Sequence, residues 1–130
     1  MKFREIFLGK NKRILLGKDK SSNDELMKIF KGKSNIILHT ESPGSPFGVI
    51  DFQKPTKEEI HLSGSAVARY SQNWRDNKKD VNMNIFTGKD IAKIKGMGIG
   101  TWKVKKLKKI IIKKGDILNT DNLIKKNDTE

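Results

Sequence analysis

The sequence predicts an α+β fold, a single domain in which a central sheet, largely antiparallel or mixed, carries two packed helices. Two short apolar runs, at 36–38 and 47–50, flank a turn segment rich in proline and glycine, which is typical of a β-hairpin. Residues 81–86 alternate apolar side chains with asparagine, the period of a half-buried strand. A chain of 130 residues is about one domain long and can bury an ordinary core. We expect the domain to span 1–116 and the polar residues 117–130 to form a flexible tail.

The first part of the chain is expected to form a hairpin and then a short helix. Residues 3–8 and 13–16 are separated by a polar turn, which indicates an N-terminal hairpin. Ser22 and Glu25 form an S-x-x-E capping box, in which two side chains satisfy free backbone N–H groups at a helix start. Gly32 is expected to end this helix, and the central hairpin follows it.

The longest helix is expected after the central hairpin. Thr56 and Glu59 form a second capping box, and apolar residues then recur at helical spacing as far as Trp74. Gly64 lies on this apolar stripe, and because glycine weakens a helix interior it indicates a close approach to another backbone or a local break. We predict that the helix ends near Asn77.

Residues 91–115 contain nine lysines and no acidic residue. Three consecutive isoleucines at 110–112 are β-branched and favour a strand, so we expect a basic hairpin with lysines pointing outward. The spacing of Val104, Leu107 and Ile111 also fits a basic amphipathic helix, which would bind a membrane or a protein partner.

The charge of the chain indicates an anionic partner. The formal net charge is +13, which suits nucleic acid or an acidic membrane surface. Only four basic residues are arginines, and because lysine is a flexible point charge, phosphate contact is favoured over base reading. Cysteine is absent, which excludes disulfides and thiolate metal sites. No apolar run is long enough for a signal peptide or a membrane span, so we expect a cytoplasmic protein.

The residues that could carry catalysis are few. His39 and His61 are the only histidines, so a metal site would need both of them together with carboxylates, and we expect no metal and no cofactor. Ser42 and Ser45 lie near His39, but neither is in a nucleophile-elbow pattern. The G-x-G-x-G at 96–100 lacks the context of a dinucleotide site and fits a mobile turn with backbone N–H groups open to phosphate.

Four pieces of sequence, in a fixed order, carry a family resemblance. They are G-K followed by N-D-E-L (17–26), L-H followed by P-G-S-P (38–46), an alanine-rich helical turn followed by Y-S-x-x-W (66–74), and K-G-x-G-x-G (95–100). Together they resemble the NFACT-R domain, an RNA-binding module of ribosome-associated quality-control factors that also occurs as a free-standing protein. The resemblance runs from Phe3 to about Asp116. It implies an α+β fold that binds RNA, such as tRNA or ribosomal RNA, and it implies no catalysis.

We therefore predict a non-catalytic RNA-binding protein with a lysine-rich contact surface and a role in translation or ribosome-associated quality control. The alternative is an RNA-modifying enzyme, or its accessory subunit, in which His39 acts with a carboxylate such as Glu41. A third hypothesis is adhesion to anionic membranes. The residues predicted to contact RNA precede the first helix, or lie in the central hairpin, on the long helix and in the basic segment: Lys18, Lys20, His39, Ser45, Arg69, Arg75, Lys93, Lys95, Lys103, Lys105, Lys106, Lys108 and Lys109.

Overall fold

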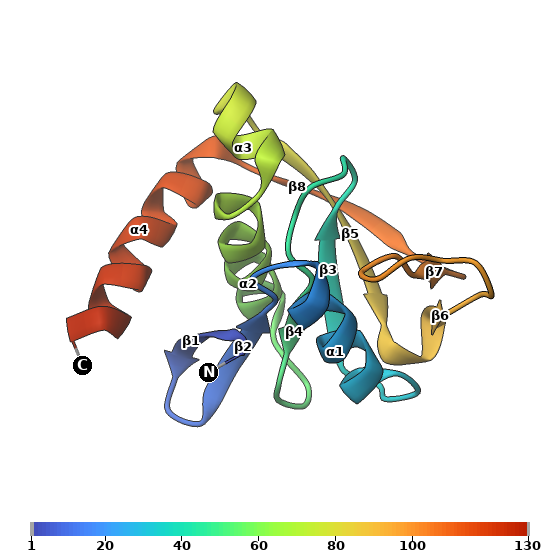
Figure 1. The fold of residues 1–130 in the computed structure, drawn as a ribbon. Helices are drawn as coiled ribbons and strands as arrows, with labels where there is room; N and C mark the ends of the chain where they lie inside the picture. Colours follow the sequence, from blue (N-terminus) through green and yellow to red (C-terminus); the bar gives the residue numbers. More distant parts are fainter. Residues whose placement is uncertain (1, 130) are drawn as a thin grey trace.

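The computed structural model describes residues 2–129 and has the predicted α+β architecture (Figure 1). Its six-stranded sheet has the order β1-β2-β4-β3-β5-β8, and every neighbouring pair is antiparallel. The strands are β1 (Arg4–Gly9), β2 (Lys12–Leu16), β3 (Ile36–Thr40), β4 (Gly48–Ile50), β5 (Val81–Thr87) and β8 (Lys108–Ile112). A separate two-stranded ribbon pairs β6 (Ile91–Ala92) with β7 (Lys103–Val104). The helices are α1 (Lys20–Phe30), α2 (Lys57–Arg69), α3 (Gln72–Asn77), α4 (Lys114–Thr129) and the 3₁₀ turn η1 (Gly88–Asp90).

The two faces of the sheet bury separate apolar clusters. Successive side chains of a strand point to opposite faces, so Leu38 packs with Val67 of α2 while Ile37 packs with Met27 of α1. The α2 face is also covered by α4, and the α1 face by the β6–β7 ribbon through Ile91. Figure 1 shows α4 on one flank of the molecule and the ribbon on the other. The N-terminal hairpin, the central hairpin and the strand at 81–86 are confirmed. The basic segment does not form one hairpin, because β7 pairs with β6 while β8 pairs with β5 in the main sheet.

The first helix starts earlier than the sequence analysis predicted. Asp19, not Ser22, is the N-cap, since its carboxylate accepts a hydrogen bond from Ser22 N at 2.8 Å. The Ser22 hydroxyl in turn accepts one from Asp19 N at 3.0 Å, which completes the capping box. Glu25 is left on the surface, where it pairs with Lys2.

The predicted long helix is two helices. The Thr56–Glu59 capping box and the end at Asn77 are confirmed, but α2 stops at Arg69. The Ser71 hydroxyl donates to Ala68 O at 2.6 Å and accepts from Trp74 N at 3.2 Å, so it closes α2 and opens α3.

Gly64 of α2 makes a close approach, as predicted, but to a side chain rather than a backbone. A Cβ built on Gly64 would lie 2.7 Å from Ile112 Cδ1 of β8. Glycine thus lets the helix pack closely on the strand that carries the three isoleucines. That strand also shows that the basic segment forms strands and not an amphipathic helix.

The expectation of a flexible tail after 116 is wrong for the described residues, because α4 runs through this segment. Ile117 and Thr120 are buried, and Asn127 bonds to both the N–H and the C=O of Phe7 in the edge strand β1. Arg69 of α2 pairs with Asp121 at 2.8 Å. The apolar residues of α4 are too few for their spacing to predict a helix. Contacts with α2 and β1 stabilise α4 instead. Among the helices within 2–129, none is both long and apolar enough to cross a membrane.

Candidate functional site

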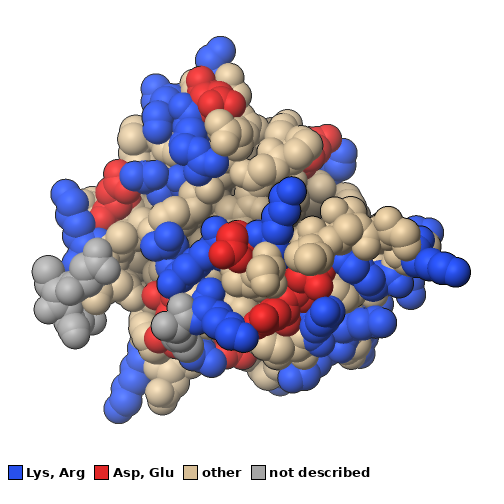
Figure 2. Space-filling model, in the orientation of Figure 1, with Lys and Arg blue, Asp and Glu red and all other residues tan. Residues whose placement is uncertain are grey.

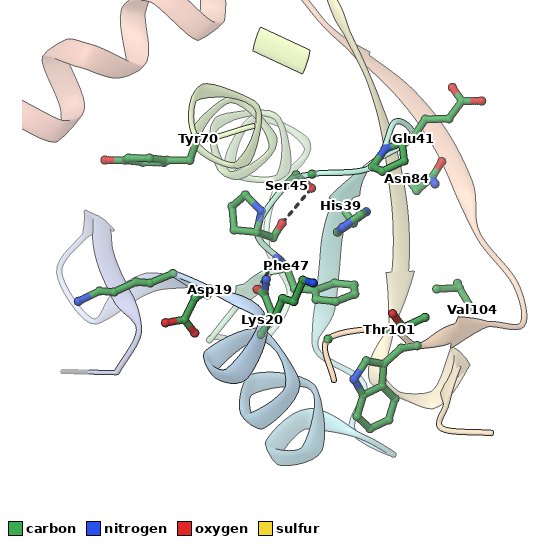
Figure 3. A pocket seen from close by; sticks show the side chains of 18 of the residues that line it. Asp19, Lys20, His39, Glu41, Ser45, Phe47, Tyr70, Asn84, Thr101 and Val104 are labelled. Carbon is green, nitrogen blue, oxygen red and sulfur yellow. Dashed lines mark hydrogen bonds between the residues drawn. The ribbon is translucent and has the colours of Figure 1, made fainter. Parts of the chain in front are cut away.

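A cavity of about 770 Å³ opens on the α1 face of the sheet (Figure 3). Its walls come from the start of β1, the segment that leads into α1, the turn of the central hairpin, the α2–α3 junction and the strand β7. This volume is in the range of sites that bind small molecules or single nucleotides. Five of the residues predicted to contact RNA line it: Lys18, Lys20, His39, Ser45 and Arg75.

Aromatic rings form the floor of the cavity. The rings of His39 and Phe47 lie 4.6 Å apart, and Phe86 meets Phe47 edge to face at 6.4 Å. Trp102 and Tyr70 supply two further aromatic walls. Figure 3 shows His39 and Phe47 between the Ser45 turn and the start of α1.

The imidazole of His39 is partly buried and bonded to the backbone. Burial lowers the pKa of His39, and contacts with the backbone carbonyls of Thr40 and Ser45 oppose this shift. Its Nδ1 donates to Thr40 O at 2.8 Å, since a carbonyl can only accept. Glu41, the carboxylate suggested as its catalytic partner, pairs instead with Lys109 Nζ at 2.9 Å. Among the side chains of residues 2–127, no carboxylate forms a hydrogen bond with His39.

Ser45 shapes the turn above the cavity. Its hydroxyl accepts from Thr40 N at 3.1 Å and donates to Pro46 O at 3.2 Å. The carbonyl of Gly44 accepts from Gln72 N at 2.8 Å, which fastens the turn to the start of α3. Gly44 has φ of +91°, where a side chain would be strained, and its Cβ would lie 2.9 Å from Gln72 Cβ. The P-G-S-P piece is therefore needed for the shape of the turn.

Positive side chains surround the mouth of the cavity. The Arg4 guanidinium lies 4.1 Å from the centre of the Tyr70 ring, and Arg75 donates to Tyr70 O at 3.1 Å. Within the described part of the chain, Arg4, Lys20 and Arg75 form no ion pair with a carboxylate. These charges remain available for an anionic ligand.

The N-terminus of α1 is not an open anion site, although Lys18 and Lys20 flank it. The Asp19 carboxylate already occupies that position, and hydrogen bonds from Ser22 lower the pKa of Asp19. A bound phosphate would therefore meet the lysine ammonium groups rather than the helix N–H groups.

A buried carboxylate holds the glycine loop against α1. Asp24 Oδ1 accepts from Lys93 Nζ at 2.8 Å and from Gly100 N at 3.0 Å. The same oxygen accepts from Trp102 Nε1 at 3.0 Å, which orients the indole at the cavity wall. The pKa of the Asp24 carboxyl lies far below its usual range. The main cause is the hydrogen bond from the Lys93 ammonium, and the bond from the Gly100 N–H is the next. We call this set of contacts the Asp24 clasp.

The clasp changes the interpretation of Lys93, which was predicted to contact RNA. Besides Asp24, its ammonium donates to Gly98 O at 2.6 Å and Thr101 O at 2.7 Å, so its donors serve the loop. The N-D-E-L and K-G-x-G-x-G pieces of the sequence thus meet in space. Gly100 itself packs on α1, since a Cβ there would lie 3.2 Å from Lys20 O.

The remaining predicted residues lie outside the cavity. Arg69 is paired with Asp121, and Lys109 with Glu41. Five other lysines are exposed and form no ion pair with a described carboxylate: Lys95, Lys103, Lys105, Lys106 and Lys108. Figure 2 shows Lys and Arg over much of this face, including a group at the end where β6 and β7 lie.

Several cavity residues were not predicted from the sequence: Arg4, Phe47, Tyr70, Asn84 and Trp102. The sequence contained one indication of the position of Asn84. It alternates with apolar residues in β5, so its side chain points away from the α2 face of the sheet. It pairs across the sheet with His39, and its Oδ1 is buried with no hydrogen-bond partner. No three described His, Asp or Glu side chains, all within 2–127, are grouped so as to hold a metal ion.

The fold and the cavity define a small basic α+β domain with aromatic and cationic groups arranged around one concave site. A family model, the NFACT protein RNA binding domain, matches residues 4–112. The chain belongs to this family, which confirms the resemblance seen in its sequence and supports RNA as its partner.

A solved structure shows the same fold. It is the C-terminal part of the fibronectin/fibrinogen-binding protein from Streptococcus suis, with a TM-score of 0.76 and 22% sequence identity. The match covers 87% of this chain but only 45% of that one, so the chain spans less than half of its length. No curated protein sequence matches the chain.

Proposed function

We propose that this domain binds folded RNA, either tRNA or ribosomal RNA, in the cytoplasm and in support of translation, without catalysing a reaction. Membership of an RNA-binding family supports the class of partner. The observation that carries the proposal is the set of five exposed lysines without carboxylate partners, beside a cavity whose mouth holds three further unpaired cations. Lys103 and Lys105 flank Val104, which is part of the cavity wall, so the two regions adjoin.

Lysine-rich surfaces of this kind bind phosphates and release counterions. The affinity should therefore fall log-linearly with salt, with a slope set by the number of phosphates neutralised. The lysines carry little information about base identity, so this part of the surface would contribute affinity and orientation rather than sequence preference.

The environment of His39 supports binding over RNA modification. A general base needs a free nitrogen close to a reacting proton and a group that orients the ring. Nδ1 donates to the Thr40 carbonyl, which orients the ring and leaves Nε2 with its lone pair, but Glu41, the carboxylate that the modification hypothesis requires, is paired with Lys109. A His39→Ala protein that fails to produce a modified nucleoside made by the wild type would overturn this part of the proposal.

The binding surface is tested by a triple charge reversal, Lys105→Glu, Lys106→Glu and Lys108→Glu. The matched control is Lys54→Glu, Lys57→Glu and Lys125→Glu, which changes the net charge equally at exposed positions around α2 and α4. Fluorescence anisotropy with labelled tRNA and a ribosomal RNA fragment should show that the first variant loses about 2–3 units of salt slope. The control should lose much less. Equal losses would mean that only net charge matters and would refute the proposed surface.

A further inference from the structure

The walls of the cavity differ in chemistry from one side to the other. The floor against the sheet carries the rings of His39 and Phe47, which contact each other at a tilt of 37°, while Arg4 and Lys20 lie at the mouth. A nucleotide has the same division, with a flat apolar base joined to a charged phosphate. Base stacking on aromatic rings is a main source of affinity for unpaired nucleotides.

Asn84 adds a polar group that is unsatisfied without a ligand. Its Oδ1 is buried and accepts no hydrogen bond from any described residue. A buried acceptor of this kind destabilises the fold unless water or a ligand supplies a donor. The Asn amide offers one acceptor and two donors, which can pair with the edge of a base. Asn84 lies directly across from His39, so its amide is beside the stacking floor.

The concave shape of the site favours an unpaired base. In a duplex both faces of a base are stacked and its Watson–Crick edge is occupied. Such a base cannot reach the floor and the Asn84 amide of a cavity enclosed by the central hairpin turn, α1 and β7. A nucleotide from a loop, a bulge or a strand end can do so.

We propose that the cavity binds one unpaired nucleotide of RNA, with its base on the His39 and Phe47 rings and its edge on the Asn84 amide. The adjoining phosphate lies toward Lys20 and Arg4. This inference rests on the proposed RNA-binding function and adds the element of RNA that is recognised. The lysine surface holds the backbone, and the cavity selects a position where a base is free.

The experiment compares two RNA hairpins that differ only by a single unpaired nucleotide in the stem. Wild-type protein should bind the bulged hairpin about tenfold more tightly than the fully paired one, measured by anisotropy at moderate salt. With 2-aminopurine at the bulge, the emission should change on binding, because the base leaves one stack and enters another.

Asn84→Ala is the test variant and Asn82→Ala its matched control. Asn82 lies two residues earlier in the same strand, has an exposed side chain and does not line this cavity. Asn84→Ala should remove most of the preference for the bulge and leave binding of the paired hairpin unchanged, while Asn82→Ala should change neither. Lys20→Gln, on the exposed first residue of α1, gives a second variant that should also weaken binding of the bulged RNA selectively.

The outcomes separate this inference from the proposed function. Equal binding of the two hairpins by the wild type, or equal effects of Asn84→Ala and Asn82→Ala, would overturn the nucleotide site and leave salt-dependent RNA binding intact. If neither hairpin shows salt-dependent binding, the proposed function fails and the nucleotide site fails with it.

Discussion

Replacing Asp24 with asparagine should loosen the whole wall that carries the glycine loop. The side chain of Asp24 is only 8% exposed, and its Oδ1 accepts hydrogen bonds from three groups of the loop. Asparagine keeps the size of the side chain but removes the charge and presents an amide that donates. The Lys93 ammonium would then lose its only carboxylate partner among the described residues.

The size of the effect follows from the exposure of the partners. Breaking a buried ion pair by removing one member costs about 3–5 kcal/mol. Lys93 is 26% exposed and can regain water, so we expect a loss of about 2–3 kcal/mol, near the upper range for hydrogen bonds to charged groups. Lys28, whose side chain is 65% exposed, adds little to the total. For a domain of this size the loss would lower Tm by about 6–10 °C.

Thermal and urea unfolding at neutral pH measure this loss, with Glu25→Gln as the control. Glu25 is the next residue on α1 and forms an exposed pair with Lys2, so its change should cost much less. Because the pKa of Asp24 is depressed in the folded protein, its stabilisation is complete above the ordinary Asp pKa and is lost as the pH falls through the depressed value. The difference between wild type and Asp24→Asn should shrink in acid. The Gly100 amide should also exchange hydrogen faster in the variant, and equal stabilities of Asp24→Asn and Glu25→Gln would refute the clasp.

Two further predictions concern His39 and α4. Burial lowers the pKa of His39 in the folded protein, so the unfolded chain takes up a proton at higher pH than the folded one. The free energy of unfolding should therefore fall as the pH drops from about 6.5 toward the folded-state pKa. Urea unfolding should show this pH dependence in the wild type and in His61→Gln but not in His39→Gln, and an unchanged pH dependence in His39→Gln would contradict the prediction. Ile117 of α4 is fully buried, so Ile117→Ala should cost about 3 kcal/mol, while Leu118→Ala at the half-exposed next residue should cost under about 1 kcal/mol. Similar values for the two would mean that α4 does not contribute to the core.

The strands could be predicted because their patterns are local. The alternation of apolar residues and asparagine in β5 has the two-residue period of a strand. The three β-branched isoleucines of β8 favour a strand by their residue type. The ends of the helices were harder to predict. Asp19 and Ser22 can each cap the start of α1, and the choice between them depends on which backbone N–H groups remain free. The break at Ser71 has the same origin, because a serine can extend a helix or restart one.

The cavity could be predicted only in part, because its walls depend on long-range contacts. Lys18, Lys20 and His39 were found through charge and rarity, while Asn84 and Trp102 needed the sheet register and the Asp24 clasp to place them. For Lys93 the sequence predicted a solvent-facing side chain, and the structure differs. A lysine in a basic segment was expected to face solvent, but an aspartate 69 residues earlier in the chain turns it inward.

β8 lies at one edge of the sheet, and this position bears on self-association. An edge strand offers unpaired backbone groups to any passing strand, and β8 also exposes Ile111 over 52% of its surface. Lys108 and Lys109 stand on that strand, and their like charges repel a second copy brought edge to edge. The same residues that would attract phosphate therefore also protect the protein against self-association. Neutral replacements at Lys108 and Lys109 would remove this repulsion, whereas glutamate at both positions would keep the two edges like-charged.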